Sequence, residues 1–466
     1  MTRFRDWLRT PDARWLLAVV ALALVVRLIV AVNVRPDPRD GRFDDSVFYD
    51  AAARHLADGD GYVFDTTVWV ARDGTPIFPN QPETTPTALW PPGYPLMLSG
   101  VYFVTGDSVD AGRMANVVFG SLTVAFVFLI ALRLFGRAPA ICAGIALALM
   151  PSHVLFTSIL MSETFYGFLL SGVLAWCVYF VLGRDRPLLP AVAGAGVLLA
   201  AAGMVRGEAL AFGGIIALLM IYEWRMRALA PLALFAAGAL LVVAPWTIRN
   251  QITMGEAIAG TTGSGRVMYQ GHNPESDGGP SLEAVGRLEA GIVEDHPGIG
   301  LKDLELYSRK EGSRLAREWA WDHKLKELEL VGRRMHLLFR NDEAGVSWMN
   351  TGNPWFSAEN QDRLINLSTA YFWGLAALAL ASAPIWFRMR DTRRLLVFAV
   401  IPYYMLVFGV LFIGDPRYHY ALYIPLAILG GLGLAAVGRI TAAQWREAFG
   451  GRTLGSVLRM YGTPEP

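Results

Sequence analysis

The sequence predicts an all-α polytopic membrane protein, and three observations lead to that fold class. Of the 466 residues, 54% are hydrophobic and the mean hydropathy is +0.37, which is unusual for a soluble chain. Apolar runs long enough to cross about 30 Å of hydrocarbon recur along the chain. Basic residues gather at alternate connections between these runs. We therefore expect about ten transmembrane helices.

The first apolar run, residues 15–34, is interrupted only by Arg27 and Asn33. It is longer than a signal-peptide core and no small-residue cleavage site follows, so we interpret it as an uncleaved signal anchor. Arg27 would either snorkel outward or pair with an acid. The other nine runs are roughly residues 110–134, 138–152, 164–182, 187–205, 208–222, 230–246, 364–386, 394–413 and 419–437.

Positive charge marks one side of the predicted bundle. Arginines precede the first run and follow every second run, as Arg225 and Arg227 do after the sixth. Such ends favour the cytoplasm, so both termini are expected inside and the acidic first loop outside. The abundance of alanine and arginine indicates a GC-rich bacterial genome, which makes the plasma (inner) membrane the expected location. A net charge of +1 gives no basic field for nucleic acid, whereas the basic ends suit anionic membrane lipids.

The spacing of the runs divides the chain into four regions. Residues 1–246 are expected to form an N-terminal transmembrane module that includes an acidic outer loop, 35–107. Residues 247–362 would form an extracytoplasmic loop or small subdomain. Residues 363–437 would supply the C-terminal transmembrane helices, and 438–466 a cytoplasmic tail.

Local order is expected inside the first outer loop. Asp45–Asp58 carries apolar residues at helical spacing and ends at Gly59, which predicts a short amphipathic helix on the membrane surface. Tyr62–Val70 alternates loosely and predicts a small strand. Leu96–Val104 is apolar but too short to span, so we expect it in the membrane interface.

The second outer region and the cysteines carry less information. Thr261–Gly279 is rich in Gly, Asn and Ser and is expected to be a loop, whereas Gly300–Arg340 has helical patterning with alternating charge. The two cysteines, Cys142 and Cys177, fall inside apolar runs. We therefore expect neither a disulfide in the outer loops nor a thiol–metal cluster.

Acidic residues at the predicted outer ends are candidate catalytic groups. Asp44 and Asp45 are adjacent, and a carboxylate beside another has a raised proton affinity, as a general base near neutral pH requires. The same pair would also suit the first turn of the helix that follows. Glu83 lies in a proline-rich stretch that restrains the backbone, and the alternative is a surface acid. Glu163 begins the fourth run, where it would either bind substrate or start the helix.

Basic and aromatic residues at the same ends are candidate binding groups. Arg206 and Glu208 occupy a short turn between two runs, and such a pair at membrane depth indicates function, although a mutual salt bridge is the alternative. A guanidinium there would fork onto a phosphate. Arg249 follows the seventh apolar run and would contact a phosphate group, although basic residues are common at the end of a span. His272 lies in the second outer region, where a lone histidine is more often an ordinary loop residue.

Arg417, Tyr418 and His419 form a dense set of donors for an anionic oxygen before the last run. The alternative is an aromatic belt with a snorkelling arginine. The predicted topology places all these acids, arginines and aromatic residues on one side of the membrane. We therefore expect them to meet in one outward-facing cavity.

The order of these motifs resembles the lipid-carrier-dependent glycosyltransferases of the GT-C fold. This group includes the bacterial aminoarabinose transferases and the protein O-mannosyltransferases of glycosyltransferase family 39. The chain departs from them in having Asp-Asp where the first-loop pair is usually Asp-Glu, and in lacking an acid-Lys-Pro-Pro motif. The resembling segments are Asp44-Asp45 with Tyr49, Pro91-Pro92-Gly93-Tyr94-Pro95, Pro151 with Ser162-Glu163, Val205-Arg206, Pro245-Trp246 with Arg249-Asn250, Gly271-His272-Asn273-Pro274, and Arg417-Tyr418.

The resemblance implies a membrane hexosyl- or pentosyltransferase of the GT-C fold. Such an enzyme moves a sugar from a polyprenyl-phosphate carrier to a hydroxyl of a lipid, glycan or protein outside the membrane, with inversion. It implies Asp44 as the base, and Asp45 or Glu83 as the group that holds the acceptor or a divalent cation, Mg or Mn. A phosphate leaving group needs positive charge, for which the candidates are Arg206, Arg249 and Arg417. Further substrate-binding candidates are Tyr49, Glu163, Glu208, His272, Tyr418 and His419.

Two other classes of protein remain as alternatives. A transporter or flippase for polyprenyl-linked lipids would need charges at the bilayer midplane and symmetry-related broken helices. In this sequence the charges gather at one face and no repeat is visible. A glycan polymerase or ligase would carry one dominant outer loop late in the chain, without an acidic loop near the start.

Overall fold

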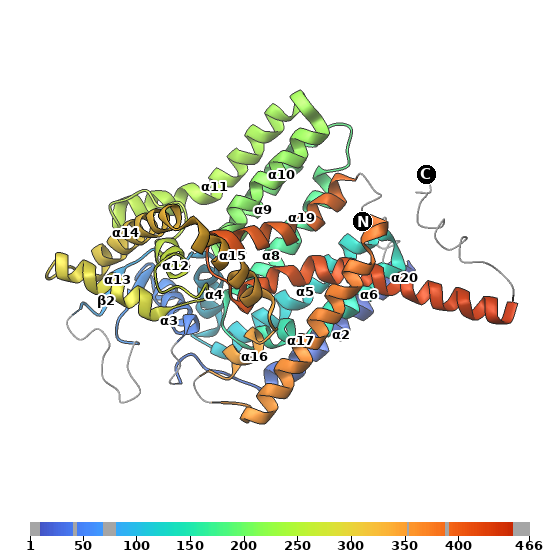
Figure 1. Ribbon diagram of the computed structural model, residues 1–466, viewed down its shortest axis with the longest axis horizontal. Coiled ribbons are helices and arrows are strands. Elements are labelled where there is room, and N and C mark those ends of the chain that lie inside the picture. The colour runs from blue at the N-terminus through green and yellow to red at the C-terminus, as the bar shows by residue number, and fades with distance from the viewer. Residues whose placement is uncertain (1–9, 41–43, 69–80, 352–353, 387–390, 451–466) are drawn as a thin grey trace.

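The protein is described by a computed structural model that covers residues 10–40, 44–68, 81–351, 354–386 and 391–450, with side chains up to residue 439 (Figure 1). Helices dominate these residues. Seven of them are long and apolar enough to cross a membrane, or eight if a bent helix pair counts as one span. The chain is therefore a multi-pass membrane protein.

The membrane-spanning candidates lie in a bundle whose centre and periphery differ in burial. The segment that ends in α20 is 78% buried, whereas α2, α10–α11 and α17 are each 22% buried, as expected for helices that face lipid. The candidate spans are α2 (Pro11–Asn33), α5 (Val109–Phe135), α8 (Ser162–Trp176) with the turn Cys177–Val181, α10 (Glu208–Trp224) with α11 (Leu229–Thr253), α17 (Ala358–Ala381), α19 (Thr392–Leu406) with the turn η4 (Val407–Leu411), and η5 (Pro416–Leu422) with α20 (Tyr423–Gly450).

The predicted count of ten spans stays a prediction. The helix α9 (Leu189–Val205) is apolar but short, and α10 and α11 count as one element of 46 residues. Arg225, with a φ of 52°, turns the chain between those two helices, and 46 residues exceed the roughly 20 that a membrane needs. Figure 1 shows that α10 and α11 meet at a common turn, from which both helices run back toward the bundle.

The bent pair consists of α6 (Arg137–Ala148) and α7 (Pro151–Leu155) with η1 (Phe156–Ser158), at 62° to each other. Arg27 of α2 is fully buried beside the bend and donates hydrogen bonds to the carbonyls of Ala148 (3.3 Å) and Leu147 (3.4 Å). Its Nη2 also lies 2.7 Å from Nδ1 of His153. Arg27 therefore neither snorkels outward nor pairs with an acid. The backbone carbonyls at the C-terminal end of α6 accept its hydrogen bonds and carry the partial negative charge that it needs.

The first loop folds as the sequence pattern predicts. The helix α3 spans Asp45–Asp58, its N-cap is Asp44, and Gly59 ends it with a φ of 91°, a left-handed conformation that glycine adopts without strain. The strand β1 (Val63–Asp65) pairs antiparallel with β2 (Thr84–Pro86). It is shorter than the strand predicted over Tyr62–Val70, whose last two residues lie outside the described chain. The helix α4 (Gly93–Thr105) contains the predicted interfacial segment.

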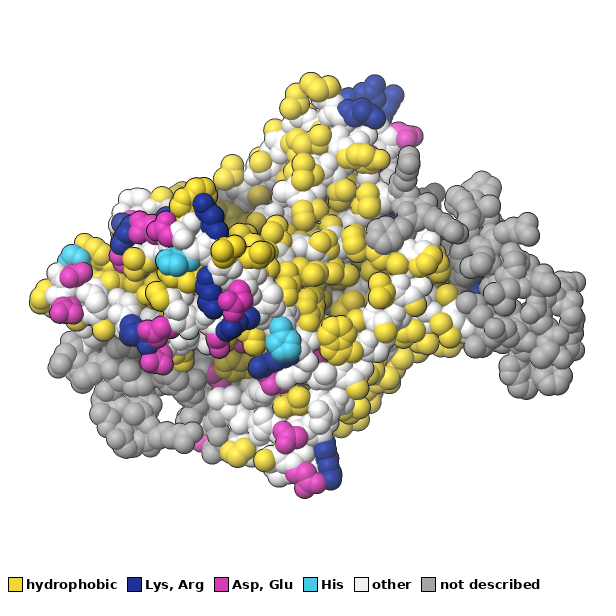
Figure 2. All heavy atoms as spheres, viewed as in Figure 1, with side chains coloured by type: hydrophobic (Ala, Val, Ile, Leu, Met, Phe, Trp, Pro, Cys, Tyr) yellow, Lys and Arg dark blue, Asp and Glu magenta, His cyan; other side chains and the backbone are white. Residues whose placement is uncertain are grey.

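The region between α11 and α17 forms a helical subdomain, α12 (Gly263–Gly271), α13 (Leu282–Asp295), α14 (Leu301–Asp322), α15 (Lys324–Phe339) and α16 (Ala344–Met349). The prediction of a loop over Thr261–Gly279 was wrong at α12. Its glycines serve helix packing, since a Cβ at Gly265 would lie 2.1 Å from the carbonyl oxygen of Arg309 on α14. Figure 2 shows charged side chains over this subdomain and hydrophobic ones over α9–α11.

The remaining short elements are η3 (Arg225–Ala228), in the turn between α10 and α11, and α18 (Ala383–Trp386). One end of the bundle carries α3, α4 and α12–α16, and we call it the loop end. The end of α20 projects from the opposite side (Figure 1). Of the predicted tail, residues 438–450 continue α20, and residues from 451 on lie outside the described chain.

Candidate active site

Five charged side chains form a continuous row at the loop end of the bundle. Asp45 lies 2.7 Å from Nη1 of Arg417, whose Nε contacts Glu163. Glu163 is also 3.0 Å from Nη1 of Arg206. The Nε of Arg206 lies 2.8 Å from Glu208. We call these five residues the charged row, and the structure brings together in it five of the residues that the sequence singled out.

The secondary structure explains where the carboxylates of the charged row lie. Asp45, Glu163 and Glu208 each occupy the first turn of a helix, namely α3, α8 and α10. The positive end of a helix dipole stabilises a carboxylate there. Three helix N-termini thus converge on one place, and the row joins segments that are remote in sequence.

The two arginines of the charged row are neutralised by the row itself. Burial works to lower the pKa of Arg206, but Glu208 and Glu163 outweigh it and hold this pKa above its usual value. The side chain of Arg417 is 12% exposed and lies between two carboxylates. Buried charges are costly unless paired, so the three acids hold the two guanidinium groups in place.

Aromatic and hydroxyl groups surround the charged row. The hydroxyl of Tyr49 lies 3.5 Å from that of Ser162, which also accepts from Arg206 at 3.4 Å. The guanidinium of Arg206 stands 5.5 Å from the ring centroid of Tyr418, a cation–π distance. Arg417 lies 5.1 Å from the ring of Trp348, a residue that the sequence did not single out. Tyr49 and Tyr418 therefore lie beside the charged row.

Asp44 and Asp45 are adjacent in sequence but have different partners. Asp44 is 6% exposed and accepts a hydrogen bond from the backbone N–H of Ser46 at 2.9 Å and another from its hydroxyl. Asp45 holds Arg417. A divalent cation between the two carboxylates would have to displace that guanidinium, and within the described ranges no three His, Cys, Asp or Glu side chains group as ligands. The residues present do not fit the expected cation.

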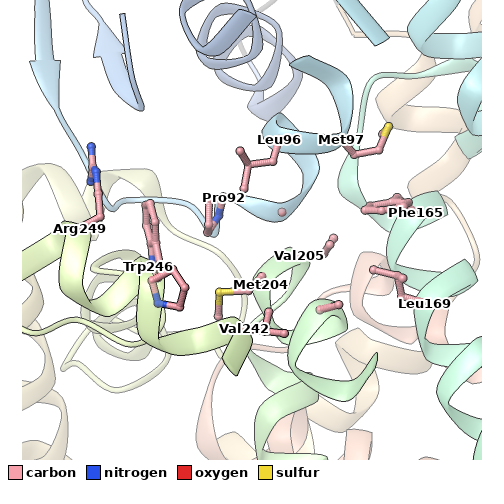
Figure 3. Close-up of a pocket in the computed structure, with 13 residues that line it drawn as sticks. Pro92, Leu96, Met97, Phe165, Leu169, Met204, Val205, Val242, Trp246 and Arg249 are labelled. Carbon is pink, nitrogen blue, oxygen red and sulfur yellow. The ribbon is translucent and has the colours of Figure 1, made fainter. Parts of the chain in front are cut away.

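An apolar groove of about 560 Å³ is lined by residues that are close in sequence to members of the charged row (Figure 3). Its wall includes Phe165, two residues after Glu163, and Val205, which directly precedes Arg206. Figure 3 shows Phe165 and Leu169 on one side of the groove, with Trp246 and Arg249 on the other. The full lining is Pro92, Gly93, Leu96, Met97, Phe165, Leu169, Ala201, Met204, Val205, Val242, Pro245, Trp246 and Arg249.

Arg249 stands in the wall of this groove and has neutral partners. It donates to the carbonyl oxygen of Thr87 at 2.6 Å, to the side-chain oxygen of Asn250 at 2.9 Å, and to the carbonyl of Tyr62. Its guanidinium also lies 5.1 Å from the ring of Trp246. A second pocket, of about 430 Å³, shares Arg249 and Trp246 with the groove and extends it toward Tyr62.

Glu305 of α14 positions the Thr87 carbonyl that holds Arg249. It is 5% exposed and accepts from the Thr87 hydroxyl at 2.7 Å, the Ala88 N–H at 2.8 Å and the Thr262 hydroxyl. Burial raises the pKa of Glu305, and these three donors oppose that rise. The sequence missed this residue, because it appears there as one acid among the alternating charges of an ordinary helix.

Two predicted histidines belong to other buried clusters. Nδ1 of His272 lies 2.8 Å from Glu327, beside Arg334, and its other nitrogen faces a backbone carbonyl. Nε2 of His419 lies 3.0 Å from Asp342, and its other nitrogen also faces a carbonyl. Since both nitrogens of each ring are engaged, the structure gives these histidines packing partners and no contact with the charged row.

Glu83 does not join the charged row either. It lies in an exposed position directly before β2, and its backbone carbonyl accepts a hydrogen bond from the N–H of Thr66 at 2.8 Å. Within the described residues its side chain has no ion-pair partner. The proline-rich stretch therefore holds Glu83 on the surface of the loop.

Comparisons with known proteins agree with this architecture. Residues 90–248, about a third of the chain, match the family described as dolichyl-phosphate-mannose-protein mannosyltransferase. The archaeal oligosaccharyltransferase AglB from Archaeoglobus fulgidus, solved with an inhibitory peptide and a dolichol-phosphate, matches with a TM-score of 0.55 at 13% identity. That match covers 98% of this chain and 54% of AglB.

The chain has the GT-C fold. A second structure of the A. fulgidus enzyme, tethered to an acceptor peptide, matches with a TM-score of 0.55 at 14% identity, over 98% of this chain and 53% of the other. ArnT from Cupriavidus metallidurans, bound to undecaprenyl phosphate, gives a TM-score of 0.43 at 15% identity, over 93% and 80%. The GT-C chain spans about half the length of the AglB structures, and no curated protein matches it.

Proposed function

We propose that this GT-C chain is a membrane glycosyltransferase that moves a sugar from a polyprenyl-phosphate carrier to an acceptor hydroxyl, with inversion. The observation that carries the proposal is the apolar groove whose wall contains Arg249 and Val205, the residue directly before Arg206 of the charged row. A groove of this kind suits a prenyl chain, and the row beside it suits a reacting phosphate ester. The dolichol-phosphate in the AglB structure supports the class of donor.

Donor binding is assigned to the groove and to Arg249. Burial of a prenyl chain against the apolar wall stabilises the complex by about 0.8 kcal/mol for each buried methylene group. The phosphate carries a negative charge, and its first contact would be a cation that no carboxylate contacts directly. Arg206 and Arg417 are paired with carboxylates, whereas the described partners of Arg249 are carbonyl oxygens. Arg249 is therefore the first contact for the phosphate.

The transfer step is assigned to the residues of the charged row and its neighbour Asp44. The acceptor oxygen attacks the anomeric carbon on the face opposite the phosphate, and its proton passes to Asp44. The bond between the anomeric carbon and the phosphate oxygen breaks, and its electron pair stays on the phosphate. That leaving group needs positive charge and no proton, and we assign the stabilisation of its developing charge to Arg417 and Arg206.

Asp45 acts as a positioning residue in this mechanism. Its contact with Arg417 fixes the guanidinium toward which the negative charge develops. The proposed mechanism uses no divalent cation, because a cation bound by Asp45 would have to displace Arg417. We expect activity to survive the removal of divalent cations with a chelator.

The orientation in the membrane is part of the proposal. Arg225 and Arg227 are exposed, and the turn between α10 and α11 that carries them lies away from the loop end (Figure 1). Basic residues favour the cytoplasm, so the charged row would face the outside of a bacterial plasma membrane and both termini the inside. The acceptor would then be a hydroxyl of an extracytoplasmic lipid, glycan or protein.

The decisive experiment is the release of polyprenyl phosphate from a mixed pool of polyprenyl-phosphate sugars by the purified protein. The Asp44→Asn variant tests the base, and Asp58→Asn, an exposed acid at the other end of α3, is the matched control. Release that requires Asp44 and tolerates Asp58→Asn supports the proposal. Release that is unchanged in Asp44→Asn would mean that another residue is the base. Lipid binding without release from any donor would favour the transporter.

A further inference from the structure

The turn between α14 and α15 exposes three large apolar side chains. Trp321 is 72% exposed, Leu325 is 86% exposed and Leu328 is 71% exposed. Leu325 and Leu328 are three residues apart and so share a face of α15. We call this set, together with Lys324 and Lys326, the α14–α15 tip. Exposed apolar groups gathered in this way mark a surface that contacts something other than water.

Both helices that carry the tip lie at the ends of candidate membrane spans. On α14, Arg309 and Lys310 contact Glu256, which follows the end of α11 by three residues. On α15, Arg334 donates to the carbonyl of Val410 at 3.1 Å, in the turn that ends the α19 span. The hairpin is thus fixed at the level where these spans leave the membrane.

The tip extends beyond these fixed points. The buried residues of α15 are Leu330, Arg334 and Leu338, which share one face. Leu328 lies two residues before Leu330, which places it on the opposite side of the helix at 100° per residue. Leu328 therefore points away from the residues that α15 packs into the fold.

The chemistry of the tip matches a lipid headgroup region. The ammonium of Lys324 lies 4.2 Å from the ring centroid of Trp321, so one amphipathic unit combines an aromatic ring with a long cationic side chain. Tryptophan is enriched at membrane interfaces, and lysine stems snorkel to bring their charge to the headgroups. All four lysines of the chain lie between residues 302 and 326, and outside this segment the long cationic side chains are all arginines.

We infer that the α14–α15 tip inserts into the headgroup region of the bilayer leaflet at the loop end and tethers the helical subdomain to the membrane. The partner is the lipid surface itself, because both helices of the hairpin are fixed to the ends of candidate membrane spans and the tip has the composition of an interfacial segment. The inference depends only on the multi-pass fold and not on glycosyl transfer.

The test uses the full-length protein in nanodiscs of phosphatidylethanolamine and phosphatidylglycerol. Cys142 and Cys177 are first replaced by alanine, and an environment-sensitive fluorophore is attached at Leu325→Cys. The matched control is the same label at Glu283→Cys on α13, where the native side chain is 83% exposed. We expect a blue-shifted emission at position 325 that brominated lipid quenches, and at position 283 an emission that aqueous iodide quenches.

The outcomes separate the bilayer from other partners. An emission at position 325 that matches the control in nanodiscs overturns the inference, and so does protection that appears only after another protein is added. The same label at Leu328→Cys provides a second position on the same face. Because the tip is exposed, Trp321→Ala with Leu325→Ser and Leu328→Ser should leave the unfolding temperature within a few degrees of that of the native protein in detergent. It should raise the proteolytic sensitivity of the hairpin in nanodiscs at least several-fold.

Discussion

Asp45 and Arg417 form an ion pair of 2.7 Å between the first loop and the segment that precedes the last helix. Arg417 also contacts Glu163, so one guanidinium ties α3 and α8 to the C-terminal part of the chain. The charged row therefore forms only when both ends of the fold are in place.

Replacement of Arg417 tests this coupling. Arg417→Ala removes one of the two cations on Glu163, whose side chain is 1% exposed, and should destabilise the fold by about 3 kcal/mol. Arg363→Ala, on an exposed arginine, should change stability by less than about 0.5 kcal/mol. Thermal unfolding in detergent measures both. Equal unfolding temperatures for the two variants would mean that the row does not hold the fold together.

Arg249 should affect donor binding more than fold stability. Its guanidinium has neutral partners at the groove wall, so Arg249→Ala should weaken the binding of polyprenyl phosphate about tenfold to hundredfold, the value of one charge-assisted contact. Arg249→Lys should keep part of the affinity, because it keeps the charge but loses the planar fork. Titration calorimetry checks both. A larger loss from Arg206→Lys would place the phosphate at the charged row instead.

Gly93 and Gly100 on α4 provide a matched pair that tests the groove. A Cβ at Gly93 would lie 2.6 Å from the carbonyl oxygen of Met204, so Gly93→Ala must push α4 away from α9. This should cost about 1–3 kcal/mol of stability and reduce lipid binding at least several-fold. Gly100 has no atom within 4 Å of such a Cβ, so Gly100→Ala should be neutral or stabilising by up to about 1 kcal/mol. Equal lipid binding by the two variants would mean that the groove is not where the donor binds.

His55 joins the end of α3 to β1 in a pH-dependent way. Its ring nitrogens lie 3.0 Å from Asp60 and 3.2 Å from Asp65. Burial works to lower the pKa of His55, but these two acids outweigh it and raise the pKa above its usual value. Burial likewise works to raise the pKa of Asp65, while Thr67 and His55 hold it below its usual range.

The sign of the pH effect follows from these directions. The contribution of His55 to stability is complete below its unfolded pKa of about 6.5 and is lost as the pH rises through the raised folded pKa. The contribution of Asp65 is present above its unfolded pKa and is lost only as the pH falls through the lowered one. The protection factor of the amides near Gly59, which compares their exchange with the intrinsic rate at the same pH, should therefore fall as the pH rises through the folded pKa of His55. His55→Gln should abolish that fall. His336→Gln, an exposed histidine, should leave it unchanged.

Local features were predictable wherever neighbouring residues determine them. The helix α3 was predicted to the residue, because Asp44, the apolar spacing and Gly59 are all contiguous in sequence. The helix α12 was missed, because its glycines look like loop residues until Arg309 of α14 lies against Gly265. The roles of Glu305 and Trp348 were equally invisible, since their partners lie on remote segments.

The sequence by itself determined the membrane class, the apolar helices and the GT-C resemblance, because composition, periodicity and motif order are properties of the linear chain. Only the tertiary structure decided which charges meet. Arg417 and His419 are two residues apart, yet one joins the charged row and the other packs against Asp342. Adjacent side chains leave the backbone in different directions, and the ion pair that each forms depends on which distant helix lies there. Packing therefore selected the site from among candidates that sequence spacing could not separate.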